Sequence, residues 1–274
     1  MRRLTGALFL TLALAACSGG VDAIATVAST QGSVGVGPQR ILVAVIDQET
    51  DEYLAREDVT PVAVLRDGIG SPLGEYEGEF VWTIPDVRGL YAFEMDIPGA
   101  NTYQLTIEAG ELGELGPIGL IAFGEPLQVA PGEDAPRSET RTVAGTPLED
   151  LTSDPDPDES FYEMTVAEAV DSGPSVIVFA TPAWCTSQSC GPMLDQVKAI
   201  APEFPGLNFV HVEVYENIHV TDPQDLVTVP AIGEWGIPSE PWLYVTDGNG
   251  VVSAAFEGAI SEDELRAALA EVSG

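Results

Sequence analysis

The segment TPAWCTSQSCGPMLD, residues 181–195, places two cysteines five positions apart, directly before an apolar stretch with helical periodicity. The continuous apolar run SVIVFA, residues 175–180, precedes it and predicts a strand buried on both faces. Between a strand and a helix, unpaired backbone N–H groups and the positive end of the helix dipole stabilise a thiolate relative to a thiol. The position of Cys185 therefore predicts a nucleophile.

The spacing limits how Cys185 and Cys190 can form a disulfide. Five helical residues rise about 7.5 Å along the axis, whereas the Cα atoms of bridged cysteines lie within about 7 Å of each other. The bridge therefore requires Cys185 outside the helix or an unwound first turn. A loop this short constrains the unfolded chain little, which favours a redox role over a purely structural disulfide, the alternative.

The first residues, MRRLTGALFLTLALAACSGG, predict a lipoprotein signal peptide over 1–16 and lipidation of Cys17. The apolar run of about 13 residues is too short for a permanent span of about 20. Two or three acyl chains on one residue would anchor the chain stably. We therefore expect a lipid-anchored protein on the extracytoplasmic face of a bacterial membrane, an oxidising location that permits a disulfide between the two remaining cysteines.

The chain has 44 acidic and 10 basic residues among 274, a formal net charge of -34. This charge disfavours binding to nucleic acids and to anionic lipids. It indicates a strongly solvated acidic surface, and no acidic run has the spacing of a calcium loop.

Changes in composition divide the chain into successive segments. Residues 17–37 are small and glycine-rich, as in a flexible tether, and residues 38–130 contain six short strand-like runs typical of a β-sandwich. Residues 131–159 are acidic and proline-rich, as in a linker. Residues 160–274 alternate helical and strand-like patterns.

In this last segment, capping boxes at Thr165–Glu168 and Ser261–Glu264 predict helix starts. A second buried strand is expected over 207–214, a β-hairpin across 248–250 and a final helix over 261–272. The order predicts an α/β fold, a mixed sheet with helices on both faces.

Residues 160–274 resemble the thioredoxin-like superfamily and its redoxin-like envelope lipoproteins. The resemblance rests on the Trp-Cys after a strand and on WGIPSEPWLYVTDGNG, residues 235–250. It implies that Pro241 is a cis-proline beside the active-site sulfur, and that Glu240, directly before it, contacts the substrate. Trp184, also a candidate substrate contact, is expected to frame the cysteines together with Trp235 and Trp242, as core or as a surface that contacts the partner. Residues 89–107, GLYAFEMDIPGANTYQLTI, are similar to the paired strands of immunoglobulin-like envelope domains.

The sequence CTSQSC is also similar to the bacterioferritin-comigratory peroxiredoxins, in which a second cysteine resolves the sulfenic acid formed on the first. That class needs an arginine beside the sulfur, and none occurs between Arg141 and Arg266. The thioredoxin pattern has its own departure, because Phe179 occupies the position of its buried acid. A carboxylate at Glu240 would disfavour the thiolate by repulsion, unless it points to solvent.

These features predict a thiol–disulfide oxidoreductase in which Cys185 attacks and Cys190 resolves, acting on thiols or disulfides of envelope proteins. No cofactor or metal is implied. The alternatives are a thiol peroxidase of peroxiredoxin type and a non-enzymatic copper chaperone or binding lipoprotein. In the copper chaperone His219 would join the two cysteines as a ligand.

Overall fold

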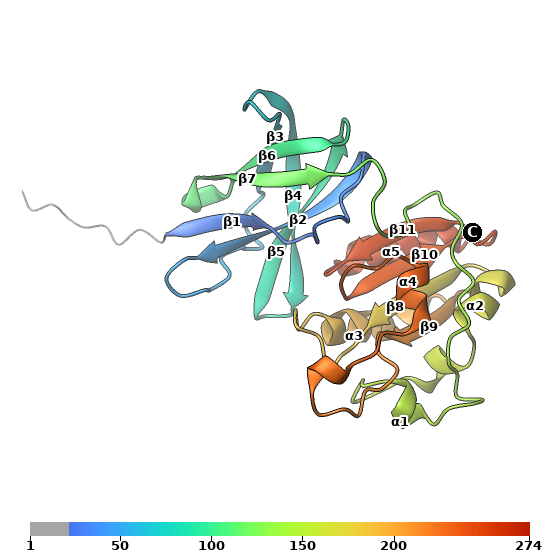
Figure 1. The fold of residues 1–274 in the computed structure, drawn as a ribbon. Coiled ribbons are helices and arrows are strands. Elements are labelled where there is room, and N and C mark those ends of the chain that lie inside the picture. Colours follow the sequence, from blue (N-terminus) through green and yellow to red (C-terminus); the bar gives the residue numbers. More distant parts are fainter. Residues whose placement is uncertain (1–21) are drawn as a thin grey trace, which may run out of the picture.

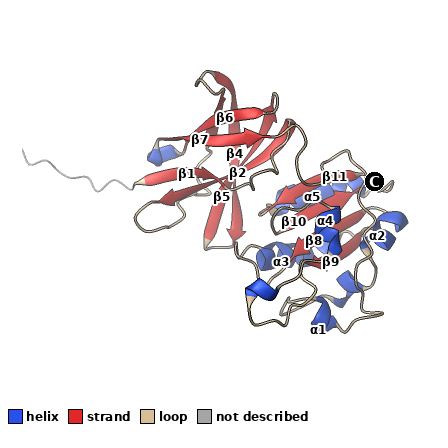
Figure 2. Ribbon diagram, viewed as in Figure 1, coloured by secondary structure: helices blue, strands red, loops and turns tan. Residues whose placement is uncertain are grey.

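The computed structural model describes residues 22–274, in which two β-sheets lie one after the other along the chain (Figure 1). Cys17 and the expected signal peptide and lipid anchor lie outside the described residues. We call the part built on the first sheet, residues 23–122, the β unit, and the helix-containing part from residue 148 to 272 the cysteine unit. Figure 2 shows that nearly all helices belong to the cysteine unit.

The β unit is a seven-stranded antiparallel sheet with the order β1-β2-β5-β4-β3-β6-β7. Taken as strands A to G, this order places A-B-E-D and C-F-G side by side, which is the arrangement of an immunoglobulin-like fold. The strands are β1 (Ala23–Val27), β2 (Gly37–Asp47), β3 (Val62–Arg66), β4 (Pro72–Ile84), β5 (Arg88–Ile97), β6 (Asn101–Glu108) and β7 (Glu114–Ala122).

Strand β4 connects the two halves of this unit. Its residues 72–77 pair with β3, and residues 78–84 pair with β5. Gly78 lies at the change of partner, where a Cβ atom would come within 2.5 Å of the Phe93 ring and 2.8 Å of the Ala92 carbonyl oxygen. Only glycine fits there, so this residue permits the close strand crossing. The strands enclose a core whose fully buried members include Ile41, Leu65, Phe93, Leu105 and Ile107.

The cysteine unit contains a four-stranded sheet with the order β11-β10-β8-β9, in which β8 and β9 are parallel and the other pairs antiparallel. Its strands are β8 (Ser175–Ala180), β9 (Asn208–Glu213), β10 (Trp242–Thr246) and β11 (Val252–Glu257). The helices are α1 (Leu148–Leu151), α2 (Val166–Ser172), α3 (Cys190–Ile200), α4 (Pro230–Glu234) and α5 (Glu262–Val272).

Both faces of this sheet are covered. Residues of α3 and α5 pack with Val176, Val178 and Leu243 on one face. Residues of α2 and α4 pack with Ile177, Phe179 and other residues on the opposite face. Strand β8 is therefore buried at every position, as its uninterrupted apolar sequence predicts. The two capping boxes and the β10–β11 hairpin are confirmed as well.

The structure corrects the predicted fold class. A thioredoxin-like α/β fold was expected over residues 160–274, after a small all-β sandwich over 38–130. The chain is instead mostly β-sheet, with 35% strand and 20% helix, and its larger sheet, in the β unit, is antiparallel and nearly closed. The prediction rested on the β-α-β order around the cysteines. A single parallel pair, β8 and β9, accounts for that order, whereas the β unit contributes most of the strands.

Two expected connecting segments are also more structured than their composition indicates. The glycine-rich tether over 17–37 contains β1, which pairs with β2 through an antiparallel register from Ala23 to Val27. The proline-rich linker over 131–159 contains α1 and the buried Ala135 and Leu151. Both segments add backbone pairing or apolar contacts to a neighbouring sheet, which low-complexity composition does not reveal.

The two units meet along a seam built from β2, β5 and the segment 257–264. Arg40 forms a buried ion pair with Glu264 at 2.7 Å and donates to the Ala259 carbonyl oxygen at 2.9 Å. Ala259 packs in an apolar cluster with Leu42, Val81 and other residues of the β unit. In residues 22–274, no helix has the length and apolarity needed to cross a membrane.

Candidate functional site

Cys185 and Cys190 form a disulfide with a Cα–Cα distance of 6.0 Å. Cys185 lies in the turn between β8 and α3, and Cys190 is the first residue of α3. Of the two solutions that the spacing allows, the chain therefore uses the one that keeps Cys185 outside the helix. Cys190 is fully buried, whereas Cys185 is partly exposed, so an incoming sulfur can reach only Cys185.

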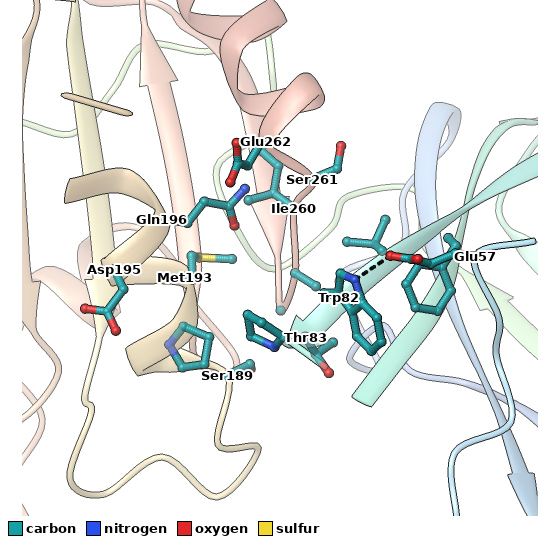
Figure 3. A pocket seen from close by; sticks show the side chains of 16 residues that line it. Glu57, Trp82, Thr83, Ser189, Met193, Asp195, Gln196, Ile260, Ser261 and Glu262 are labelled. Atoms are coloured by element: carbon teal, nitrogen blue, oxygen red, sulfur yellow. Dashed lines mark hydrogen bonds between the residues drawn. The ribbon is translucent and has the colours of Figure 1, made fainter. Parts of the chain in front are cut away.

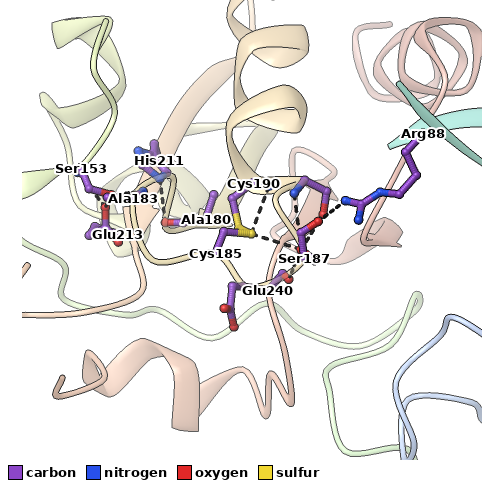
Figure 4. Close-up of a disulfide and its surroundings, with 11 residues drawn as sticks. Arg88, Ser153, Ala180, Ala183, Cys185, Ser187, Cys190, His211, Glu213 and Glu240 are labelled. Carbon is purple, nitrogen blue, oxygen red and sulfur yellow. Dashed lines mark hydrogen bonds between the residues drawn. A yellow bond between two sulfur atoms is a disulfide. The ribbon is translucent and has the colours of Figure 1, made fainter. Parts of the chain in front are cut away.

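The N-terminus of α3 points a backbone donor at the exposed sulfur. The Cys190 N–H donates to Cys185 Sγ at 3.3 Å (Figure 4). In the described chain, the N-cap residue Ser189 makes no side-chain capping bond, and the first turn contains no acid. The Cys185 sulfur thus takes the place of a capping oxygen, a location that stabilises a thiolate through the helix dipole and the N–H donor.

A chain of serine hydroxyls links this sulfur to neighbouring segments. Ser187 Oγ lies 3.1 Å from Cys185 Sγ and 2.7 Å from Ser189 Oγ. It also makes a long contact of 3.5 Å with the carbonyl oxygen of Glu240. This contact brings the segment around Glu240 next to the loop that carries the sulfur. The peptide bond between Glu240 and Pro241 is cis.

Glu240 contributes its backbone rather than its carboxyl group to this contact, and the carboxyl extends away from the disulfide (Figure 4). Burial raises the pKa of Glu240, and the charge of Glu213 raises it further. The contact of Glu240 with the cysteine loop is therefore made by its carbonyl oxygen, and its role in substrate binding stays a prediction. A raised pKa reduces the negative charge that would oppose a thiolate nearby.

The tryptophans occupy different places. Trp184 is partly exposed, and its indole N–H donates to the Ile218 carbonyl oxygen at 3.1 Å, which fixes the loop before Cys185. Trp235 and Trp242 are buried with Phe179 in the core on the opposite face of the sheet from α3. They do not frame the cysteines, although their sequence positions indicated that they would.

Arg88, which the sequence did not indicate as a site residue, reaches the loop between the cysteines from the first residue of β5. Its guanidinium donates to the Ser187 carbonyl oxygen and, at 3.0 Å, to Thr83 Oγ1. It also lies over the ring of Tyr53. From the sequence we expected no arginine near the cysteines, because none occurs between Arg141 and Arg266. Arg88 instead comes from the β unit, earlier in the chain (Figure 4).

A buried polar cluster lies at the end of β9, on the other side of the cysteine turn. His211 contacts the Tyr162 hydroxyl at 2.6 Å and the Ala180 carbonyl oxygen at 3.0 Å, and burial lowers its pKa. Glu213 is 3% exposed and accepts from the N–H and hydroxyl of Ser153, and its second oxygen has no partner among the described residues. The available sequence signal was the pair of ionisable residues, His211 and Glu213, in a strand that also contains three apolar residues.

The histidines do not join the cysteines. His219 is exposed and pairs with Asp150 at 2.8 Å, whereas His211 belongs to the buried cluster. In the described part of the chain, no three side chains of His, Cys, Asp or Glu are grouped so that they could hold a metal ion.

Comparisons with known proteins leave the family open. No family model matches the chain, and no curated protein matches it. Among solved structures the chain is similar to the Lin-41 filamin domain, with 16% identity, a TM-score of 0.24 and coverage of 37% of this chain and 93% of that domain. The comparisons returned no thioredoxin-like protein, and they overturn the predicted membership of that superfamily, its peroxiredoxin-like variant included.

Proposed function

We propose that this protein is a thiol–disulfide oxidoreductase whose reactive group is the Cys185–Cys190 pair. The observation that carries the proposal is the asymmetry of the disulfide. Cys185 is partly exposed and accepts the N–H at the start of α3, whereas Cys190 is fully buried beneath it. One sulfur is therefore open to a partner and activated, and the other is placed for the intramolecular step.

The chemistry is balanced with the partner protein as the only co-reactant. A partner thiolate attacks Cys185 Sγ, which forms a mixed disulfide and releases Cys190 as a thiolate. A second partner thiolate then attacks the partner's own sulfur in the mixed disulfide and releases Cys185. The partner loses two electrons and becomes a disulfide, while the pair gains two electrons and, on protonation, two thiols. In the reverse direction Cys185 attacks a partner disulfide and Cys190 resolves it.

The direct test is the reduction potential of the pair in the full-length chain. The chain is equilibrated with glutathione buffers, the thiols are trapped, and the state of the Cys185–Cys190 peptide is read by mass spectrometry, which separates it from Cys17. A potential between about -270 and -120 mV is the range of working oxidoreductases. A bond that stays closed below about -300 mV would contradict the proposal.

Thiol peroxidase activity is the second candidate, because the structure places Arg88 at the loop between the two cysteines. Its guanidinium contacts the Ser187 carbonyl oxygen rather than the sulfur, so it would have to change partner to bind peroxide. Rapid formation of a sulfenic acid at Cys185 under micromolar peroxide would favour this candidate. Exchange with disulfides but not with peroxide would favour the oxidoreductase.

We further propose that the chain acts outside the cytoplasm as a lipoprotein anchored through Cys17, where envelope proteins supply thiols or disulfides. The support is the sequence of residues 1–20, with its two arginines, apolar run and small residues before the cysteine. Mass spectrometry of the mature N-terminus should find acyl chains on Cys17. Recovery of the Cys17→Ser variant in the membrane fraction at the level of the wild type would contradict the anchor.

A further inference from the structure

A cavity of about 670 Å³ lies between the β unit and the cysteine unit (Figure 3). Its volume falls within the range of about 300–1,000 Å³ that is usual for ligand sites. The β unit supplies residues from the end of β4, and the cysteine unit supplies the first turns of α3 and the segment that leads into α5. The apolar part of the lining is formed mainly by Trp82, Pro85, Pro192, Met193, Ala259 and Ile260.

This cavity is adjacent to the reactive sulfur. Ser189, which lines it, is hydrogen-bonded to Ser187 at 2.7 Å, and Ser187 Oγ lies 3.1 Å from Cys185 Sγ. Two side-chain contacts thus separate the sulfur from the cavity. An extended polypeptide advances about 3.3 Å per residue, so a partner bound through a cysteine at Cys185 can place a side chain two or three residues away in the cavity.

The charged side chains around the cavity are acidic, which favours a positively charged partner segment. Glu57, Asp195 and Glu262 line it, and no lysine or arginine is among the described residues that do. Glu57 accepts the indole N–H of Trp82, which holds its carboxylate at the cavity. The chain as a whole carries a net charge of -34, so long-range attraction also favours a cationic partner.

The tip of the β4–β5 hairpin extends the same surface towards the disulfide. Pro85 lines the cavity, Val87 is 73% exposed, and Arg88 contacts the loop between the cysteines. Val87 therefore adds exposed apolar surface next to the apolar lining of the cavity, and a continuous apolar patch of this kind can contact another protein. The hairpin therefore brings the β unit into the reach of a partner that reacts with Cys185.

We propose that this cavity binds a short extended segment of the partner polypeptide, with an apolar side chain in the cavity and lysine or arginine beside it. The inference rests on the proposed function for the identity of the occupant. It assigns to the β unit half of the partner-binding site, and it defines the substrate class as cysteine-containing segments that are apolar and basic.

The probes are three nine-residue peptides with one cysteine. The first has phenylalanine two residues from the cysteine and lysines at both ends, the second has glycine for the phenylalanine, and the third has glutamates for the lysines. Each peptide thiol, and dithiothreitol as a small reference, is reacted with the oxidised full-length protein. Each peptide rate is divided by the dithiothreitol rate. We expect this ratio to be at least ten times larger for the first peptide than for the other two. The difference between the first and third peptides should decrease as the salt concentration rises.

A matched pair of variants locates the effect. Gln196 is on the wall of the cavity, opposite Trp82 (Figure 3), and Ala199 is exposed on the same helix and does not line the cavity. Gln196→Trp should reduce the selectivity for the first peptide at least tenfold, whereas Ala199→Trp should retain it. Equal rates for the three peptides, or full selectivity in Gln196→Trp, would overturn the inference.

Binding measured without chemistry separates this inference from the proposed function. The same peptides with serine for cysteine are titrated calorimetrically into the oxidised protein. If the pair fails to exchange thiols but the apolar basic peptide binds and Gln196→Trp weakens it, the cavity inference holds without the oxidoreductase. If exchange proceeds with dithiothreitol and no peptide is preferred in rate or in binding, the oxidoreductase holds and the cavity inference fails.

Discussion

The helices α5 and α3 both begin after a serine, but their first turns carry different groups. Ser261 caps α5 by accepting from the Glu264 N–H, and this turn contains three acids. Ser189 makes no such bond in the described structure, the first turn of α3 contains no acid, and Cys185 Sγ receives the N–H of Cys190 instead. Although the chain has 44 acidic residues, none lies in the first turn of α3, so the Cys185 sulfur occupies the positive end of this helix.

An arginine of the β unit reaches each of these two helix starts. Arg40 of β2 binds the carboxylate of Glu264 at 2.7 and 3.0 Å, in a pair whose side chains are only 9% and 17% exposed. Arg88 of β5 binds a neutral carbonyl oxygen, that of Ser187. The first contact ties the two units together through charge, whereas the second orders a loop and leaves the sulfur without a fixed ionic partner.

The difference between the two helix starts is tested most directly by removing each sulfur of the disulfide in turn. Cys185→Ser should lose exchange completely, because the accessible nucleophile is gone. Cys190→Ser should still form a mixed disulfide with a partner and then stall, because only the resolving step is lost. Trapping with a thiol-reactive mass tag after mixing with a disulfide peptide distinguishes the two. Equal trapping in both variants would show that the two sulfurs are equivalent.

Removing Arg40 should give the largest loss of stability. Arg40→Met keeps most of the apolar stem but leaves Glu264 without its cation, and breaking a buried pair in this way costs about 3–5 kcal/mol. Urea unfolding of the full-length chain measures the loss. Arg266→Met is the control, because its ion pairs with Glu203 and Glu262 are more exposed, and it should cost much less stability than Arg40→Met. Similar losses in both would show that the seam contributes little.

Local patterns made part of this comparison predictable. The capping boxes were identified from their residue spacing, and the need to keep Cys185 outside the helix followed from helix rise against disulfide reach. Both rules involve residues fewer than six positions apart. The strand-like runs of the β unit likewise followed from short apolar segments between turn residues.

The rest depends on contacts that sequence spacing does not encode. Arg88 lies 99 residues before Ser187, and Arg40 lies 224 residues before Glu264, so neither could be assigned to the cysteine unit in advance. The same limit applies to β1, whose small residues read as a tether until β2 provides a pairing partner. The predicted fold class was wrong because the β-α-β order around the cysteines was given more weight than the strand-like runs, whereas the larger sheet lies in the β unit.

A change at Gly191 would sharpen the comparison by making α3 resemble α5. Gly191 is in the first turn of α3, and a Cβ atom there meets nothing within 4 Å. Gly191→Glu adds a carboxylate where α5 has its acids, which should raise the pKa of the Cys185 thiol and slow its attack several-fold. Gly191→Gln matches the size without the charge. Rates with a small uncharged disulfide as a function of pH give the thiol pKa, and identical values in the two variants would contradict the dipole argument.

The smallest expected effect compares the glutamates beside the two helix starts. Burial raises the pKa of Glu240, with Glu213 adding to it. For Glu264, burial acts in the same direction, but Arg40 and the Ser261 hydrogen bonds outweigh it and lower the pKa. The unperturbed value of both is 4.5. A group whose pKa is raised in the folded protein contributes stability below pH 4.5, and this contribution is lost as the pH rises through the raised pKa. A group whose pKa is lowered contributes stability above pH 4.5, and this contribution is lost as the pH falls.

The free energy of unfolding between pH 3.5 and 8 therefore separates the two sites. Relative to Glu240→Gln, the wild type should lose stability as pH rises from 4.5 through the raised pKa of Glu240. Relative to Glu264→Gln, it should lose stability as pH falls below 4.5, because Arg40 then loses its anion. If the two difference curves of unfolding free energy against pH had slopes of the same sign, the carboxylate of Glu240 would be stabilised by a cation in solution. The contrast between a charged seam and a cysteine sulfur without a fixed ionic partner would then be wrong.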